Sequence, residues 1–150
     1  MLSRRYRALE TLRTRLGAIS VANGFRTDAG LLLFMGEDVE LGPDDGMSAI
    51  AVGVRPDEVR YQGENVTSVV PVEVAALVKA SIEFPLLVLE DVIGDIKRAV
   101  EQPDRTLGGL LVQRGLERGS VRPLDREPGS ETVGAVVEYS MTMAEAWGNP

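Results

Sequence analysis

Carboxylate side chains are the groups of this sequence best suited to move protons, because its 150 residues include neither histidine nor cysteine. Glu90, Asp91 and Asp95 lie close together in the chain, and neighbouring carboxylates support acid–base catalysis when their surroundings separate their pKa values. These residues fall on the polar side of an expected helix, where water solvates all of them. We therefore predict a solvated helix face and no catalytic residue, and we expect that the chain is not an enzyme.

The missing residue types also exclude several kinds of site. Without histidine or cysteine, the chain alone cannot build a Ser–His or Cys–His nucleophile, a disulfide or a thiolate metal centre. The glycine-containing segments lack the lysine that a phosphate-binding loop requires. We therefore predict no cofactor and no metal site. An alternative stays open in the acidic segment of residues 36–46, where Asp44 and Asp45 could contact a divalent ion.

Charge is distributed unevenly along the chain. Residues 1–16 carry five arginines against Glu10, a net charge of +4, and subtracting this from the total of −7 leaves −11 for the remaining residues. The arginines form either a solvated helix face or a charged contact with a partner subunit. An acidic chain lacks the clustered cations that DNA binding needs, and it suits a surface that DNA passes without sticking.

Two amphipathic helices are expected to position these charges. In residues 2–16, Ser3 can cap the helix and Gly17 can end it, and the spacing of the apolar residues predicts a buried stripe of Leu2, Tyr6, Leu9, Leu12 and Leu16. The second helix begins at Pro85 and stops before Pro103. Its predicted buried stripe consists of Leu86, Leu89, Ile93, Ile96 and Val100. Gly94 in this helix suggests a close neighbour.

Strands are expected on both sides of the second helix. The runs 31–35 and 47–54 are apolar, whereas 66–78 and 133–143 alternate as strands with one face in the core. Tyr139 shares the apolar parity of the last run, which predicts core packing. Pro71 lacks a ladder donor and predicts an edge strand or a bulge. Residues 107–118 are interpreted as a further strand.

The order of these elements predicts an α+β fold of two layers. We expect a mixed, mostly antiparallel sheet of four to six strands with two main helices on one face. We expect residues 1–150 to form a single domain with long loops at 36–46, 55–65 and 118–131, although the last of these could also be the tip of an extended hairpin. No apolar run is long enough to span a bilayer and no signal peptide is visible, so synthesis in the cytoplasm without membrane contact is expected.

Several of these segments together resemble a known family. An N-terminal helix leads into ANGFRTDAG, and PVEVAALVKA, LEDVIGDIKRAV and the turn of DRTLGGL follow before a final strand that closes on WGNP. This pattern is similar to the tail terminator, or tail completion, proteins of long-tailed bacteriophages, over nearly the whole chain. Similar proteins often show Gly-Asp-Pro where this chain has Gly148-Asn149-Pro150.

The resemblance implies a structural virion protein that is assembled in the host cytoplasm. Such proteins form a ring, usually hexameric, that caps the tail tube, stops its growth and receives the head-side connector. The expected partners are further copies of the chain, the tail tube protein, the connector and, in contractile tails, the sheath protein, while genomic DNA passes through the lumen. On this basis Arg4, Arg5, Arg7 and Trp147 are predicted interface residues, although Trp147 could equally dock on its own domain. The acidic residues predicted at the lumen or on a ring face are Glu37, Asp38, Glu40, Asp44 and Asp45.

Two other functions stay open on the sequence. The nearer alternative is another neck component, such as a head–tail connector or a head-closure protein, because these are also small ring-forming proteins. The alternative from a different class is a small enzyme or ligand-binding domain that uses carboxylates. That alternative predicts a concave pocket with desolvated acids and a stable monomer or dimer.

Overall fold

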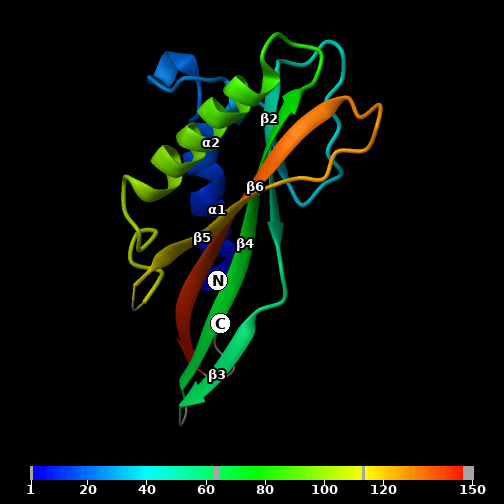
Figure 1. Cartoon of the computed structure of the whole chain (residues 1–150). Helices are drawn as coiled ribbons and strands as arrows, with labels where there is room; N and C mark the ends of the chain where they lie inside the picture. Colours follow the sequence, from blue (N-terminus) through cyan, green and yellow to red (C-terminus); the bar gives the residue numbers. More distant parts are fainter. Residues whose placement is uncertain (1, 63–64, 113, 147–150) are drawn as a thin grey trace.

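A computed structural model describes residues 2–62, 65–112 and 114–146 of the chain (Figure 1). Within these residues two α-helices accompany a mixed six-stranded sheet, which confirms the predicted α+β fold. The helices are α1 (Arg4–Gly17) and α2 (Pro85–Glu101), with short 3-10 turns η1 (Val21–Asn23) and η2 (Ala29–Leu31). The strands are β1 (Leu33–Met35), β2 (Ser48–Val54), β3 (Glu58–Gln62), β4 (Asn65–Lys79), β5 (Leu116–Pro123) and β6 (Thr132–Ala146).

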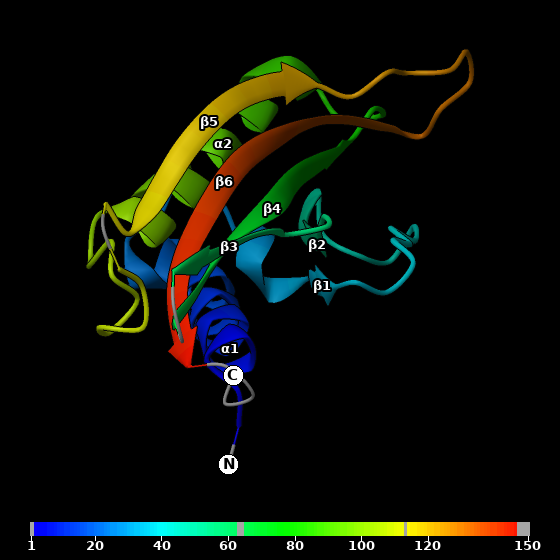
Figure 2. The same ribbon diagram turned by 90° about the horizontal axis from the view of Figure 1, so that it is seen from below.

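The antiparallel pair β4 and β6 forms the centre of the sheet. The strand order is β1-β2-β4-β6-β5, and β3 also pairs with β4. Strands β1 and β2 run parallel, and the other pairs are antiparallel. The register of β4 and β6 extends from Asn65 opposite Ala146 to Lys79 opposite Thr132. Both helices lie on the same face of this sheet (Figure 2), which leaves the other face without a helical layer.

Side-chain alternation determines which face of the central strands meets the helices. The even-numbered residues of β4 from Val66 to Val78 are buried, while most odd-numbered residues stay partly exposed. In β6 the buried odd-numbered residues run from Val133 to Met143 and include Tyr139, which is 2% exposed. These positions confirm the strands predicted at 66–78 and 133–143 and the core position of Tyr139. Side chains alternate between the two faces of a strand, so apolar residues at every second position bury one face.

The first helix follows its predicted pattern except at its start. The Ser3 hydroxyl accepts a hydrogen bond from the Tyr6 backbone N–H and so caps α1. Leu12 and Leu16 are buried, and Leu9 packs against the core. Leu2 and Tyr6 are 54% and 53% exposed, so the stripe was predicted too far toward the N-terminus. The first turn of the helix lies beside the last residues of β6, where Arg4 bonds to the Ala144 carbonyl, and the Leu2 and Tyr6 side chains stay exposed there.

The second helix also departs from prediction at its N-terminal turn. Leu89, Ile93, Ile96 and Val100 are buried as predicted, whereas Leu86 is 65% exposed and that assignment was wrong. The expected close neighbour of Gly94 was wrong as well, because a Cβ at this position would meet nothing within 4 Å. Gly94 lies on the solvent side of α2.

The loop predictions need correction in several segments. Residues 55–65 contain β3, which forms a hairpin with the start of β4. Residues 118–131 contain most of β5 and the turn that leads to its antiparallel partner β6, as the hairpin alternative predicted, and the strand predicted over 107–118 begins only at Leu116. Upstream of it, Leu107 and Leu111 are 1% and 4% exposed and bury a turn in the core. Their apolar character reflects this anchoring and not strand alternation.

Pro71 lies in the interior strand β4, so the prediction of an edge strand was wrong, but its local situation resembles an edge. Val72 pairs with Val54 at the end of β2, and Val69 pairs with Glu58 at the start of β3. The Pro71 carbonyl accepts from the Arg55 N–H, so the missing N–H of Pro71 would point to this same side of the strand. The proline therefore falls where one neighbouring strand ends and the next begins.

Candidate functional site

A groove of about 560 Å³ opens at the end of the molecule where α2 and β2 begin. It combines exposed apolar side chains with a surplus of carboxylates. We call it the acidic groove and define it by apolar Val21, Leu31, Met47 and Val88 and charged Arg26, Asp28, Asp44, Asp45 and Asp91. With four carboxylates and one guanidinium, it suits a partner that brings apolar surface and positive charge.

Most of the carboxylates around the acidic groove have intrachain hydrogen bonds. Asp28 accepts from the Val21 N–H at 2.8 Å, Asp45 accepts from the Gly42 N–H at 2.6 Å, and Asp91 pairs with Arg26 at 3.2 Å. Within the described chain, the exposed Asp44 carboxylate has no such partner. Asp44 is therefore the carboxylate most available to an incoming cation.

The predicted acidic loop divides into two parts. Asp44 and Asp45 line the acidic groove, whereas Glu37, Asp38 and Glu40 lie outside its lining and are exposed. The Lys79 ammonium donates to the backbone carbonyls of Pro43 and Asp45, at 3.3 and 2.7 Å, and ties this part of the loop to the end of β4. The described residues hold no group of three or more carboxylates arranged to bind a metal ion.

The predicted basic residues lie at the opposite end of the molecule, at the start of α1. Arg4 donates to the carbonyl of Ala144 in β6, and Arg5 pairs with Asp57 at 3.4 Å. The exposed Arg7 side chain has no partner among the residues that the structure describes. Arg4 and Arg5 thus also hold α1 to its own sheet, while Arg7 remains available to a neighbour. Trp147 lies outside the described residues.

Asp95 is a structural residue that the sequence interpretation misplaced. It was predicted with Glu90 and Asp91 on the solvated face of the helix, but it is only 3% exposed. It accepts hydrogen bonds from the Arg26 N–H at 3.1 Å and from the Thr27 N–H and hydroxyl at 2.8 Å each. The position of Asp95 around the helix could have indicated its burial. Val92 and Ala99, about one turn before and after it, and the adjacent Ile96 are all buried. Asp95 fixes the NGFRTD turn against α2 and does no chemistry that an exposed substrate could reach.

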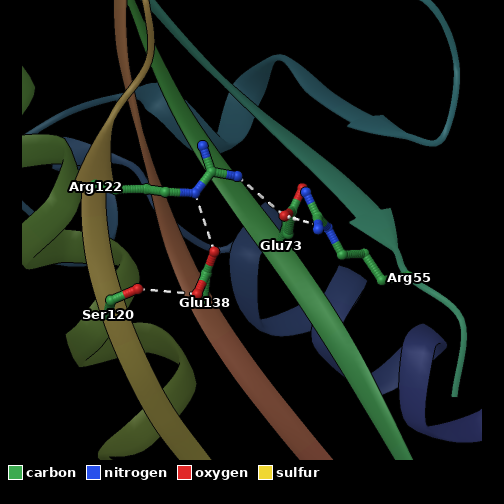
Figure 3. A network of polar contacts seen from close by, with 5 residues as sticks. All are labelled: Arg55, Glu73, Ser120, Arg122 and Glu138. Carbon is green, nitrogen blue, oxygen red and sulfur yellow. Dashed lines mark hydrogen bonds and ion pairs between the residues drawn. The ribbon is translucent and has the colours of Figure 1, made fainter. Parts of the chain in front are cut away.

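A polar network crosses the helix-free face of the sheet (Figure 3). Glu73 and Glu138 are directly opposite each other on β4 and β6, a position in which like charges repel. Arg122 on β5 donates to both carboxylates at 3.0 Å, and Arg55 pairs with Glu73 at 2.6 Å. Ser120 adds a hydrogen bond to Glu138 at 2.9 Å. The network joins neighbouring strands and favours the ionised form of the Glu138 carboxylate, whose pKa is lowered by the Arg122 hydrogen bond.

The network predicts a definite pH dependence. Hydrogen bonds from Arg122, and secondarily from Ser120, hold the pKa of Glu138 below its ordinary value of 4.5. A carboxylate with a lowered folded-state pKa stabilises the fold above its unfolded-state pKa, and this contribution is lost as the pH falls through the folded-state pKa. We expect Glu138→Gln to lower the melting temperature at pH 6, with a difference from the wild type that shrinks steadily below pH 4.5. Thermal unfolding of both proteins between pH 2 and 7 measures this difference.

The matched control for this experiment is Glu127→Gln. Glu127 is also exposed, in the loop between β5 and β6, and its carboxylate has no partner within the described residues. Its difference from the wild type should stay small and flat with pH. A flat difference for Glu138→Gln as well would show that the network does not bind the carboxylate in solution.

Tyr139 is the buried residue with the largest change in acidity. Burial raises its pKa well above the ordinary value, and the nearby charge of Glu101 raises it further. The hydroxyl donates to Glu101 at 3.0 Å, and Arg118 lies 3.5 Å from the same carboxylate. A phenol held in its protonated form in this way anchors β6 to the end of α2 and cannot act as a base near neutral pH.

Comparisons with known proteins assign no function to the acidic groove or to the polar network. A scan against protein-family models found no match, and a search of curated proteins found none either. Over the described residues, no helix is both long and apolar enough to cross a membrane.

Proposed function

We propose that this chain is a structural virion protein that forms a ring, of about six copies by its resemblance to tail terminators, at the end of a phage tail tube. In this role it stops the growth of the tube and provides the docking surface for the head-side connector. The ring would be assembled in the host cytoplasm and remain in the neck of the virion. In a contractile tail it would also contact the sheath protein.

The observation that carries this proposal is the amount of large apolar surface exposed at the two ends of one copy. Leu2 and Tyr6 are about half exposed at the start of α1. At the other end, six large apolar residues are between 57% and 72% exposed: Val21, Leu31, Met47, Phe84, Leu86 and Leu87. Apolar surface gathered in this way is typical of a protein that is covered by partners in its working state.

The sheet and its charges support the same proposal. Strand β5 pairs with β6 along one side, and no strand of the described chain pairs with its other side. A neighbouring subunit can cover such an edge. The outward-facing Glu37, Asp38 and Glu40 would line the lumen or a ring face, where negative charge repels DNA phosphates and lets the genome slide. Arg4, Arg5, Arg7 and Trp147 remain the proposed interface residues.

The chemistry of the described carboxylates argues against the enzyme alternative. Asp95 is occupied by backbone N–H groups, and Glu73 and Glu138 are neutralised by arginines. For Glu138 the hydrogen bonds from Arg122 and Ser120 lower the pKa, whereas a general acid needs a raised pKa. A structural role makes use of this stability without requiring a reactive group.

Purified chain mixed with isolated tail tubes tests the proposed function. We expect rings of about six copies, in solution or at tube ends, and tubes that no longer lengthen when free tube protein is added. Native mass spectrometry counts the copies, and electron microscopy measures tube length. Binding to filled heads in place of tubes would indicate another neck component. A chain that stays monomeric and binds neither structure would contradict the proposal.

A further inference from the structure

The two apolar ends of the molecule carry opposite charge. The basic end, which we define as Leu2, Arg4, Arg5, Tyr6 and Arg7, presents two exposed apolar side chains among three guanidinium groups. The acidic groove presents exposed apolar side chains among four carboxylates and one arginine. Each surface therefore has the composition that would complement the other.

One copy cannot bring these two surfaces together. Arg4 bonds to Ala144, which pairs with Thr67 near the start of β4. The groove residue Met47 accepts from the N–H of Lys79, at the far end of the same strand. The rise of an extended strand places these positions about 40 Å apart. Figure 1 shows the start of α1 and the start of β2 toward opposite ends of the sheet.

The volume and the charges of the groove suit the basic end. A volume of about 560 Å³ accommodates an aromatic side chain together with an aliphatic one. Tyr6 lies between arginines in the sequence RRYR, and tyrosine and arginine are both enriched among the residues that dominate binding at the centre of interfaces. Arg7 and Asp44 both lack intrachain partners within the described part of the chain, so they can pair across an interface without breaking a contact.

We propose that the acidic groove of one copy receives Leu2 and Tyr6 of a second copy, with Arg7 of the second copy beside Asp44 of the first. This inference rests on the proposed function, because it names the contact that would join the copies of a ring. The contact is heterologous: each copy gives its basic end to one neighbour and its groove to another. Contacts of this kind form a ring when the rotation between successive copies closes.

Variants blocked at one end test the pairing. The basic-end variant carries Tyr6→Ala and Arg7→Ala, and the groove variant carries Leu31→Arg and Asp44→Arg, so the two altered surfaces do not attract each other. All four side chains are exposed, so folding should not suffer. We expect each variant alone to associate at least 10-fold more weakly than the wild type, in solution and on tube ends. An equimolar mixture should form a heterodimer that grows no further, because the intact groove of one variant binds the intact basic end of the other and only the two altered surfaces stay exposed. Analytical ultracentrifugation measures both results.

Matched controls are available at exposed charges elsewhere on the same chain. Arg13→Glu changes an arginine further along α1, and Asp125→Arg changes an aspartate in the loop before β6. Both should assemble as the wild type does. If they assemble normally and the blocked variants do so too, the pairing is overturned while the ring itself stands. A mixture of blocked variants that stays monomeric also overturns it.

Disulfide cross-linking gives a second test of the contact, because it reports which residues of two copies lie close together. Because the chain has no cysteine, Leu2→Cys in one copy and Leu31→Cys in another give one cysteine per copy, and only the 2–31 disulfide joins the two different variants. Under mild oxidation the mixture should give a disulfide-linked heterodimer, whereas Leu2→Cys mixed with Asp125→Cys should not. Equal cross-linking in the two mixtures would overturn the pairing. If the wild type never associates with itself or with tubes, the proposed function fails, and this contact fails with it.

Discussion

Replacing Asp95 by alanine is expected to lower the free energy of unfolding by about 3 kcal/mol. The carboxylate is 3% exposed and accepts from the N–H groups of Arg26 and Thr27 and from the Thr27 hydroxyl. Truncation leaves these donors without an acceptor in a region that water cannot easily enter, and a buried donor without a partner costs its full desolvation free energy. For a domain of this size the melting temperature should fall by about 6–12 °C. Urea and thermal unfolding measure both quantities.

The matched control is Asp91→Ala, one turn earlier on the same helix. Asp91 pairs with Arg26 at 3.2 Å, but the Asp91 and Arg26 side chains are 43% and 78% exposed. Exposed ion pairs contribute little, so a loss of less than about 1 kcal/mol is expected. Equal effects of the two substitutions would show that the buried hydrogen bonds of Asp95 do not form in solution.

Gly30→Ala is expected to destabilise the fold by about 3 kcal/mol or more, because its backbone packs directly against the end of α1. A Cβ on Gly30 would lie 2.2 Å from the Leu16 carbonyl oxygen, 2.7 Å from the Ile19 carbonyl oxygen and 2.9 Å from the Ile19 nitrogen. All three are backbone atoms, so no side-chain rotation relieves the overlap. The Gly30 N–H also donates to the Ile19 carbonyl at 3.0 Å, and this bond would break if the chain moved apart. Chemical denaturation of the variant measures the loss.

Gly94→Ala, in contrast, is expected to raise the free energy of unfolding. That residue lies within α2 on the solvent side, and an added Cβ meets nothing within 4 Å. Alanine is favoured over glycine in a helix by about 1 kcal/mol, so Gly94→Ala should stabilise the protein. A stabilising effect at Gly30, or a loss at Gly94 as large as that at Gly30, would contradict the packing described for these two positions.

Elements that bury one regular face could be predicted from the sequence. The alternation in β4 and β6 and the spacing of Leu89, Ile93, Ile96 and Val100 in α2 each require a particular face to meet the core. The fold class follows from these elements, because two helices and a sheet with one apolar face can only stack in two layers. In these cases local pattern and tertiary packing favour the same conformation.

Strands β3 and β5 were not predicted because tertiary contacts hold them in place, and such contacts produce no periodic pattern of apolar residues in the sequence. The polar strand β3 forms because it pairs with β4, and β5 is polar over most of its length because its side chains meet solvent or the network around Glu138. The acidic groove could not be predicted either. Its walls come from the η1 and η2 region, the loop before β2 and α2, and only the folded chain brings them together. The charge asymmetry of the sequence did indicate that acids and arginines would lie on different surfaces, but not that each would surround apolar side chains.

Pro71 has a mechanical consequence for the whole sheet. On one side of β4, the pairing with β2 ends and the pairing with β3 begins at this residue. Proline has no backbone N–H, so position 71 cannot donate a hydrogen bond between these two neighbouring strands. Opening of the β3 hairpin therefore need not propagate into β2, and the sheet is divided along this side into two segments that can exchange their amide protons independently. A protein built in this way can change the conformation of one end of its sheet while the other end keeps its shape.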